Sequence, residues 1–263
     1  MPKNQWFLGT IGFSYKDWIG SFYPPGSTQR GFLSYYSKVF NGVELNTTFY
    51  SIPSTVTLHS WLNTTTKQFR FCVKTPKRIT HELGLKDAQS LMMEFIDSLL
   101  PLNEKMGPIL IQLPPKYKQE NYSILEEFLK SLPLSHQYAI EFRHGSWFNQ
   151  KTSNLLAKYQ VCWVSNDYPN LPKEINLTSN FLYIRWIGVN GMYQHHTHER
   201  VDKTDEFRWW LEKLQPFYSQ ISTCYGFFNN DYTGFAAGTC KRFKLFIDLP
   251  DEIEIHPYQD RLF

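Results

Sequence analysis

The chain has 263 residues, of which 42% are hydrophobic and 17% aromatic, and its formal net charge is +3. This hydrophobic content supports a sizeable core and excludes a disordered chain, and the small charge gives little support for nucleic acid as a partner. The length fits one large domain or two small ones, because barrels of this size often form a single domain.

The cysteines and the N-terminal residues exclude further classes of protein. The four cysteines are far apart in the sequence and form no C-x-x-C pair, which argues against a zinc ribbon or a redox motif. The N-terminal residues carry one charge and then a hydrophobic run that is too short for a signal peptide. No segment reaches the roughly 20 hydrophobic residues that a membrane-spanning helix needs. We therefore expect a cytoplasmic protein that does not act at a membrane.

Short hydrophobic runs rich in β-branched and aromatic residues recur along the whole chain. Each run has the length of a strand and is bounded by Gly, Pro, Asn or Asp. We predict eight strands, at residues 7–13, 43–46, 70–75, 108–113, 138–143, 161–167, 181–188 and 224–230.

The segments between these runs mostly carry hydrophobic residues at helical spacing. Residues 168–180 lack such a pattern. We predict helices at residues 28–40, 53–62, 87–100, 122–132, 146–159, 207–214 and 233–243.

Eight strands that alternate with helices predict an α/β protein with one (β/α)8 TIM barrel, spanning residues 1–263 with an acidic tail at about 248–263. A doubly wound open sheet is the main alternative. It usually carries a glycine-rich phosphate-binding turn after its first strand. The first predicted turn has only Gly9 and Gly12, so that fingerprint is missing.

Charged and amide side chains gather at the C-terminal ends of the predicted strands. In a barrel these ends meet at one face, which carries the active site. The side chains are those of Glu44, Asn46, Lys74, Gln112, Glu141, Arg143, Asp167, Arg185, Asn229 and Asn230.

Strand alternation places several of these charges inside the predicted barrel. In the fifth strand Ile140 and Phe142 share one face, and Glu141 and Arg143 share the other. The second and third strands repeat this pattern. Because a buried charge is costly unless it is paired, the repetition predicts a paired polar cluster at the barrel mouth. A purely structural ion-pair network explains the same pattern, and the strand-end amides also suit simple turns.

Eight motifs, in chain order, resemble the DUF72 family, the YecE-like proteins. They are GTIGFSYKDWIGSFYPPG, FNGVELNTTFYSIPS, FRFCVKTPKRITH, GPILIQLPP, AIEFRHGSW, VSNDYP, LYIRW-G and YGFFNND, and the resemblance runs from about Gly9 to Gly238. It implies a TIM barrel distantly similar to metal-dependent sugar isomerases and endonucleases, and it implies the site better than the reaction. One departure is Ile187, which stands where the family pattern Y-x-R-x-H-G has histidine.

We expect an enzyme that uses general acid–base chemistry on an anionic small molecule, phosphorylated or carboxylated and sugar-like, as a hydrolase or an isomerase. Cationic side chains would clamp the anion, and aromatic side chains would stack on the sugar or base. The expected catalytic residues are Glu44, Glu141, Asp167, His81 and Lys74. The expected substrate-binding residues are Tyr15, Trp18, Asn46, Tyr50, Gln112, Arg143, Arg185 and Asn229.

Two other functions fit the same residues. Glu44, Glu141 and Asp167 are the candidate ligands of Mg²⁺ or Mn²⁺ in a metal-dependent hydrolase or an endonuclease-like barrel. The strand ends offer no histidine and three competing cations, so we expect no cofactor. A barrel that binds a ligand or a partner without catalysis is the third hypothesis. The stretch from His195 to His198 is more typical of a solvated loop than of a zinc site. The oligomeric state is left open.

Overall fold

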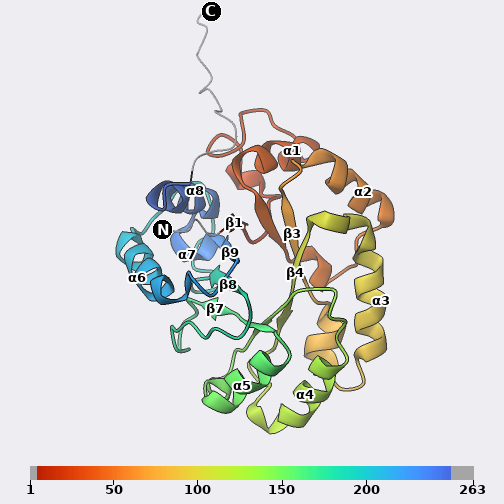
Figure 1. The fold of residues 1–263 in the computed structure, drawn as a ribbon. Helices are drawn as coiled ribbons and strands as arrows, with labels where there is room; N and C mark the ends of the chain where they lie inside the picture. The colour runs from red at the N-terminus through yellow and green to blue at the C-terminus, as the bar shows by residue number, and fades with distance from the viewer. Residues whose placement is uncertain (1–4, 250–263) are drawn as a thin grey trace, which may run out of the picture.

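The computed structural model describes residues 5–249, so most of the expected acidic tail lies outside the described residues. Strands lie in the interior and helices at the periphery (Figure 1). The strands are β1 Gln5–Thr10, β2 Gly42–Leu45, β3 Arg70–Lys74, β4 Met106–Gln112, β5 Tyr138–Glu141, β6 Cys162–Trp163, β7 Ser165–Asn166, β8 Phe181–Trp186 and β9 Thr223–Phe228. No helix within the described residues is long and apolar enough to cross a membrane.

The helices occur where the hydrophobic spacing predicts them. They are α1 Gln29–Val39, α2 Thr55–Thr64, α3 Gln89–Leu99, α4 Tyr122–Lys130, α5 Gln150–Lys158, α6 Thr204–Leu214, α7 Asn230–Thr233 and α8 Ala236–Phe246. The last predicted segment is divided into α7 and α8, because Gly234 adopts a left-handed conformation with φ of 100° and ends α7. Residues 168–180 contain no helix, as expected.

Hydrogen bonding groups the strands into two parallel sheets, with the orders β1-β9-β8-β7 and β2-β3-β4-β5-β6. The strand predicted at residues 161–167 is interrupted at Val164, so β6 pairs with β5 and β7 pairs with β8. At the other junction, Ile11 and Glu44 form an isolated parallel bridge, and the Gly12 amide donates to the Glu44 carbonyl over 2.8 Å. The fold is therefore α/β with parallel sheets, and within residues 5–249 the hydrogen bonds define two sheets rather than one closed ring.

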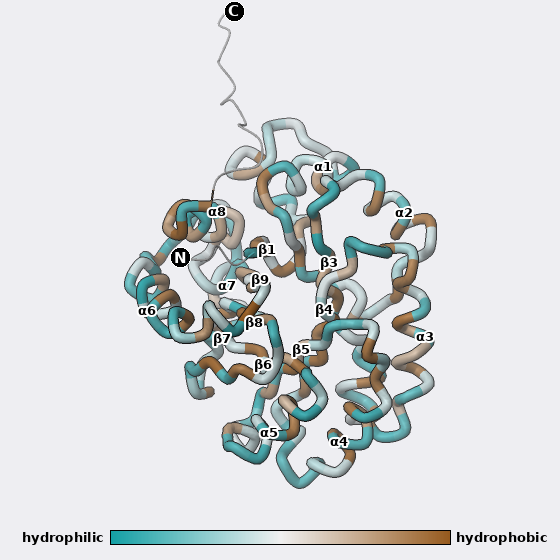
Figure 2. The backbone as a smooth tube through the Cα atoms, in the orientation of Figure 1, coloured by the Kyte–Doolittle hydropathy of each residue, from teal (hydrophilic) through white to brown (hydrophobic). Residues whose placement is uncertain are grey.

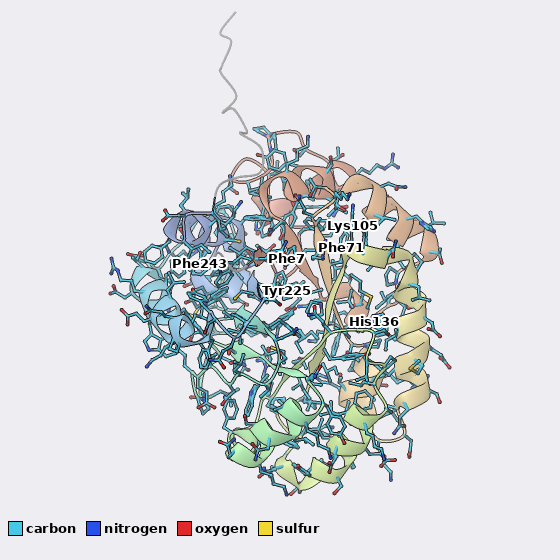
Figure 3. All side chains as sticks on the ribbon, in the orientation of Figure 1. Phe7, Phe71, Lys105, His136, Tyr225 and Phe243 are labelled. Atoms are coloured by element: carbon cyan, nitrogen blue, oxygen red, sulfur yellow. The ribbon has the colours of Figure 1, made fainter. Side chains whose placement is uncertain are left out.

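Hydrophobic side chains form two clusters, one on each side of the strands. The larger cluster lies between strands and helices, where Phe243 of α8 contacts Trp6 and Phe228 (Figure 3). The smaller cluster lies on the inner faces of the strands, where the rings of Phe7 and Tyr225 stack with centroids 5.1 Å apart. Figure 2 shows hydrophobic backbone segments along strands such as β5 and β6. Strands buried on both faces in this way are typical of parallel sheets covered by helices.

The inner faces carry small residues next to charged ones. Cys72, Ala139 and Cys162 belong to the inner cluster and are almost fully buried. Cys72 and Ala139 each lie two residues before a charged side chain at the C-terminal end of the strand, Lys74 and Glu141. The inner space is therefore filled by hydrophobic side chains at its middle and by polar ones toward the C-terminal ends.

We predict that Gly9→Ala strongly destabilises the protein, because β1 and β2 approach closely at this position. A Cβ at Gly9 would lie 1.9 Å from the Gly42 carbonyl oxygen and 2.5 Å from the Tyr36 hydroxyl. We expect a loss of about 3 kcal/mol in the free energy of unfolding, measured by urea denaturation. Gly31→Ala is the control, because a Cβ at this exposed position in α1 meets nothing within 4 Å.

The Gly31→Ala variant should gain roughly 0.5–1 kcal/mol, since alanine restricts the unfolded chain more than glycine does. Equal effects of the two substitutions would show that the close approach at Gly9 relaxes without a penalty.

Candidate functional site

A buried ion cluster links the two sheets. Arg185 of β8, in the four-stranded sheet, donates from Nε and Nη2 to the two carboxylate oxygens of Glu44 of β2, over 2.8 and 2.7 Å. Its Nη1 donates to the carboxylate of Glu141 of β5. Glu44 and Glu141 are fully buried and Arg185 is 3% exposed. The bidentate geometry compensates the desolvation that burial imposes on these charges.

Two further side chains complete the bonding of the carboxylates. Arg143 donates from Nε to Glu141, and its guanidinium lies 3.8 Å from the centre of the Tyr168 ring. Tyr183 donates its hydroxyl to Glu44 over 2.9 Å. Burial alone would raise the pKa of Glu141, but the guanidinium groups of Arg143 and Arg185 outweigh burial and hold that pKa below its usual value. Glu141 therefore stays ionised.

Lys74 lies at the end of β3 beside this cluster. Its Nζ is 4.1 Å from the centre of the Phe49 ring, and it makes no hydrogen bond to any residue within 5–249. Burial, followed by the charge of Arg185, lowers the pKa of Lys74 to about 8, although Glu141 and Glu44 oppose this. The carboxylates that act on this lysine thus accept their hydrogen bonds from other groups.

His81 also contacts Phe49, from the single turn Arg78–Glu82 after β3. Its ring meets the Phe49 ring edge to face at 4.9 Å, and its Nδ1 pairs with the Thr80 hydroxyl over 2.8 Å. Burial, followed by the charge of Lys74, lowers the pKa of His81 to about 4. The imidazole is therefore neutral at pH 7.

Sequence reasoning missed Phe49, the ring that contacts both Lys74 and His81. It selected the neighbouring Tyr50, whose side chain is 82% exposed. The missed signal is the position of Phe49 in Thr47–Phe49, a short helical turn directly after β2. In such a turn the residue that faces inward cannot be read from strand alternation.

Asp167 does not join the ion cluster. It accepts from Lys173 over 3.2 Å and from the Tyr232 hydroxyl over 3.3 Å. Among residues 5–249, no group of three or more His, Cys, Asp or Glu side chains is placed to hold a metal ion. Glu44, Glu141 and Asp167 thus do not assemble as the metal ligands considered from the sequence.

Asn166, rather than its neighbour Asp167, is the buried polar residue at this strand end. It follows Val164 of the inner cluster by two residues, so alternation directs it to the same side. Asn166 is 5% exposed, and its Oδ1 has no hydrogen-bond partner. The alternation of Cys162, Val164 and Asn166 predicts this side for Asn166. The sequence analysis selected Asp167 instead because it is charged.

Three of the expected binding residues have structural partners. Trp18 is fully buried, and its indole N–H donates to Asn230 over 3.3 Å. Asn229 accepts from the Asp231 amide over 2.9 Å and so caps α7. Gln112 donates to the Leu113 carbonyl over 2.6 Å.

Buried polar atoms without a partner concentrate at the C-terminal ends of the strands. Five of the eight such atoms among the described residues lie in β7 or within three residues after β2, β3 or β9. They belong to Asn46, Thr75, Ser165, Asn166 and Asp231. An unsatisfied buried polar group costs about 1–3 kcal/mol, so this concentration indicates a place prepared for a polar ligand.

The loop after β8, at residues 187–203, folds back over the same end of the strands. The His196 amide donates to Asp17 over 3.2 Å, and its ring lies 6.4 Å from the ring of Tyr15. Burial and then the charge of Glu44 raise the pKa of Tyr15 to about 12, which indicates that this tyrosine lies near the ion cluster. The histidine stretch expected to be solvated thus contacts the rim of the site through His196.

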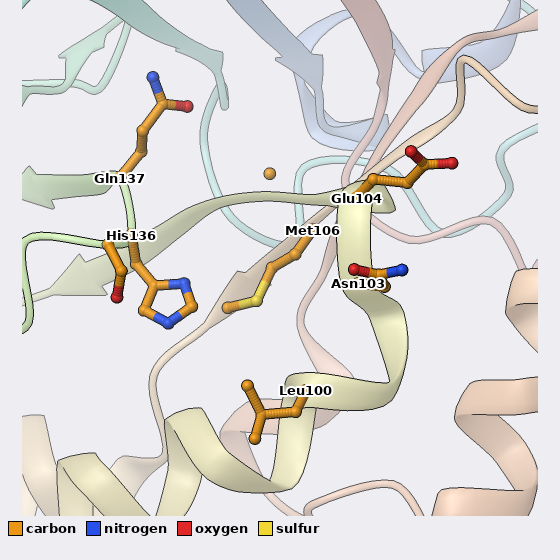
Figure 4. Close-up of a pocket in the computed structure, with 8 residues that line it drawn as sticks. Leu100, Asn103, Glu104, Met106, His136 and Gln137 are labelled. Carbon is orange, nitrogen blue, oxygen red and sulfur yellow. The ribbon is translucent and has the colours of Figure 1, made fainter.

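Two pockets differ in their position relative to the ion cluster. One, of about 250 Å³, lies beside this loop and is lined by residues that include Asp167, Tyr193 and Asp231. The other, of about 380 Å³, lies at the N-terminal ends of β4 and β5 and is lined by residues that include Met106 and His136 (Figure 4). The ion cluster occupies the C-terminal ends, so the second pocket is separate from the candidate site.

Comparison with known proteins places this arrangement in a family. The chain is 30% identical over 246 residues to the UPF0759 protein YecE of Escherichia coli strain K12, covering 84% of this chain and 85% of that protein. It resembles a crystal structure of a DUF72 family protein from Thermotoga maritima MSB8, with a TM-score of 0.79, 32% identity and coverage of 93% of this chain and 99% of the other.

A DUF72 family protein from Enterococcus faecalis V583 has the same fold, with a TM-score of 0.77, 20% identity and coverage of 97% of this chain and 99% of that chain. The family model described as "Protein of unknown function DUF72" matches residues 7–258. The chain therefore belongs to the DUF72 family, whose curated members include the UPF0759 protein YecE.

Proposed function

We propose that the protein is an enzyme that acts by general acid–base chemistry on an anionic small molecule with a phosphate or carboxylate group. One observation carries the proposal: a neutral imidazole, that of His81, lies within the field of several cations. The groups that act on it are Lys74, Lys77, Lys116 and Arg143. Such a field favours an anionic ligand and leaves the imidazole free to accept a proton.

The buried carboxylates have a different role in this proposal. Glu44 and Glu141 hold Arg185 and Arg143, so their oxygens are already bonded and their charges compensated. They position the guanidinium groups, and His81 and Lys74 carry protons. Asp167, which is bonded to Lys173 and Tyr232, takes part at the edge of the site.

We further propose that the two sheets form one eight-stranded barrel and a single domain. The Ile11–Glu44 bridge connects β1 to β2, and Val164 alone separates β6 from β7. In that arrangement β6 and β7 are two parts of one interrupted strand. The C-terminal strand ends would then surround one site, where barrel enzymes have their active sites.

A non-catalytic ligand-binding barrel is the alternative function. It is favoured by the complete pairing of Glu44 and Glu141, since fully paired carboxylates are poor proton carriers. Turnover of phosphorylated or carboxylated sugars by the intact protein supports an enzyme. Binding of such compounds without turnover supports the alternative.

We predict that inorganic phosphate raises the melting temperature of the protein and that the cations near His81 are required for this effect. The double substitution Lys77→Gln and Lys116→Gln should weaken phosphate affinity roughly tenfold, equivalent to about 1.4 kcal/mol. Melting curves at increasing phosphate concentration give the affinity, because a ligand that binds only the folded state stabilises it.

The control for phosphate binding is the double substitution Lys151→Gln and Lys158→Gln on α5. It removes the same net charge from a different surface, so it should leave the affinity within about twofold of the original. Equal weakening by both pairs, or no stabilisation of the original protein, would contradict the anion site.

We predict that Lys74→Met stabilises the protein by about 1 kcal/mol, raising the melting temperature by roughly 2–4 °C at pH 7. The lowered pKa of about 8 means that the folded protein holds the protonated amine less well than the unfolded chain does. Below pH 8 this penalty is fully present. It is relieved as the pH rises from about 8 toward the ordinary value for lysine near 10.4.

The difference in melting temperature between the Lys74→Met variant and the original protein should therefore be smaller at pH 9.5 than at pH 7. Lys130→Met, at an exposed position in α4, is the matched control and should show no such pH dependence. A Lys74→Met variant that is less stable at pH 7 would indicate that this amine supports the fold.

A further inference from the structure

We infer that Lys74 is a carbonyl-reactive amine, which forms an imine with an aldehyde or ketone group of the anionic substrate. This inference rests on the proposed function and makes it more specific, because it adds a carbonyl group to the phosphate or carboxylate already expected. It also assigns Lys74 a covalent role, whereas the sequence predicted only that this lysine holds the anion or transfers a proton.

The first argument is that the half-buried Lys74 lacks the partners that the buried lysines Lys105 and Lys244 have. Lys105 is 6% exposed, and its Nζ donates to the carbonyls of Leu62 and Thr65 over 2.7 and 2.9 Å (labelled in Figure 3). Lys244 donates to the Val39 carbonyl over 2.8 Å. Lys74 faces only the Phe49 ring, so its nitrogen is not engaged by an acceptor among the described residues.

The second argument is that the surrounding charges keep acceptors away from this amine. Four charged groups act on Lys74: Arg185 and Arg143 repel its proton, and Glu141 and Glu44 attract it. Glu44 accepts hydrogen bonds from Arg185, and Glu141 accepts them from Arg185 and Arg143, so neither carboxylate forms an ion pair with Lys74. A lysine that is desolvated and lies near other cations is the usual arrangement of a nucleophilic amine.

The third argument concerns the population of the reactive form. With a pKa of about 8, roughly a tenth of Lys74 is uncharged at pH 7. An ordinary lysine is uncharged in about one molecule in 2,500 at that pH. Nucleophilicity falls somewhat as the pKa falls, so we expect a net advantage of about tenfold over an exposed lysine.

The chemistry balances without an oxidant or a reductant. The nitrogen lone pair of neutral Lys74 attacks the carbonyl carbon, a C–N bond forms, and the carbonyl oxygen takes up a proton. The C–O bond then breaks, the oxygen leaves as water, and the nitrogen electrons form the C=N bond. Overall, ammonium and carbonyl give protonated imine and water. Neutral His81, which contacts the same Phe49 ring as Lys74, is the group that accepts a proton during the exchange in this proposal.

The test is reductive trapping on the intact protein. Pyridoxal 5′-phosphate, an aldehyde that carries a phosphate, is added at pH 8 and reduced with borohydride, and the labelled peptides are measured by mass spectrometry. We expect Lys74 to be labelled about tenfold faster than exposed Lys130. The rate at Lys74 should rise with pH and level off above about 8, whereas the rate at Lys130 should still rise at pH 10. Equal rates at the two lysines at pH 8 would overturn the inference.

Two further arms separate this inference from the proposed function. Lys74→Arg keeps the positive charge and cannot form an imine, so the adduct on this peptide should disappear. Should that variant fail to fold, the comparison of Lys74 with Lys130 in the original protein still decides the question. Pyridoxine 5′-phosphate, the corresponding alcohol, reports the anion site alone through its effect on the melting temperature.

Stabilisation by the alcohol without preferential labelling of Lys74 overturns the imine and leaves the anion site in place. Preferential labelling of Lys74 without stabilisation by the alcohol supports the reactive amine and counts against the anion site. If both effects are seen, they support both proposals. If the alcohol gives no stabilisation and Lys74 is not preferentially labelled, both proposals are overturned.

Discussion

The bonds of Arg185 to Glu44 and Glu141 are the interaction on which the rest of the site depends. The arginine belongs to the four-stranded sheet and both carboxylates belong to the five-stranded sheet, so one guanidinium connects the two. Removing water from three charges is costly, and only a bidentate arrangement with good geometry compensates that cost. The relative position of the two sheets at this point is therefore tied to the positions of these hydrogen-bonding atoms.

The same pairing determines the properties of the neighbouring lysine. Because Glu44 and Glu141 are bonded to arginines, Lys74 lies half-buried beside them without an ion pair. Desolvation and then the charge of Arg185 lower its pKa to about 8. Desolvation and then the charge of Lys74 lower the pKa of His81. The ion cluster thus has two unusual groups at its edge, both in contact with the Phe49 ring.

The unsatisfied polar atoms and the unpaired lysine lie on the same side of the molecule. Each reduces the free energy of unfolding compared with a satisfied or hydrophobic group in the same place. A protein that concentrates such groups at one end of its strands gives up stability there. The opposite strand ends show no comparable concentration among the described residues, and this asymmetry is what the proposed binding and catalysis would account for.

The sequence by itself determined the order of strands and helices, the family, and the residues of the ion cluster. Periodicity and strand alternation are local properties, so they predicted that Glu44, Glu141 and Arg143 point away from the hydrophobic faces of their strands. The hydrogen-bond partners of these side chains depend on tertiary structure, because Glu44 and Arg185 are about 140 positions apart and meet only where the two sheets meet. Only the structure showed that Lys74 is left unpaired, that Asn166 rather than Asp167 is buried, and that Phe49 contacts both Lys74 and His81. These three outcomes follow from the competition of several groups for the same few acceptors, which no single stretch of sequence records.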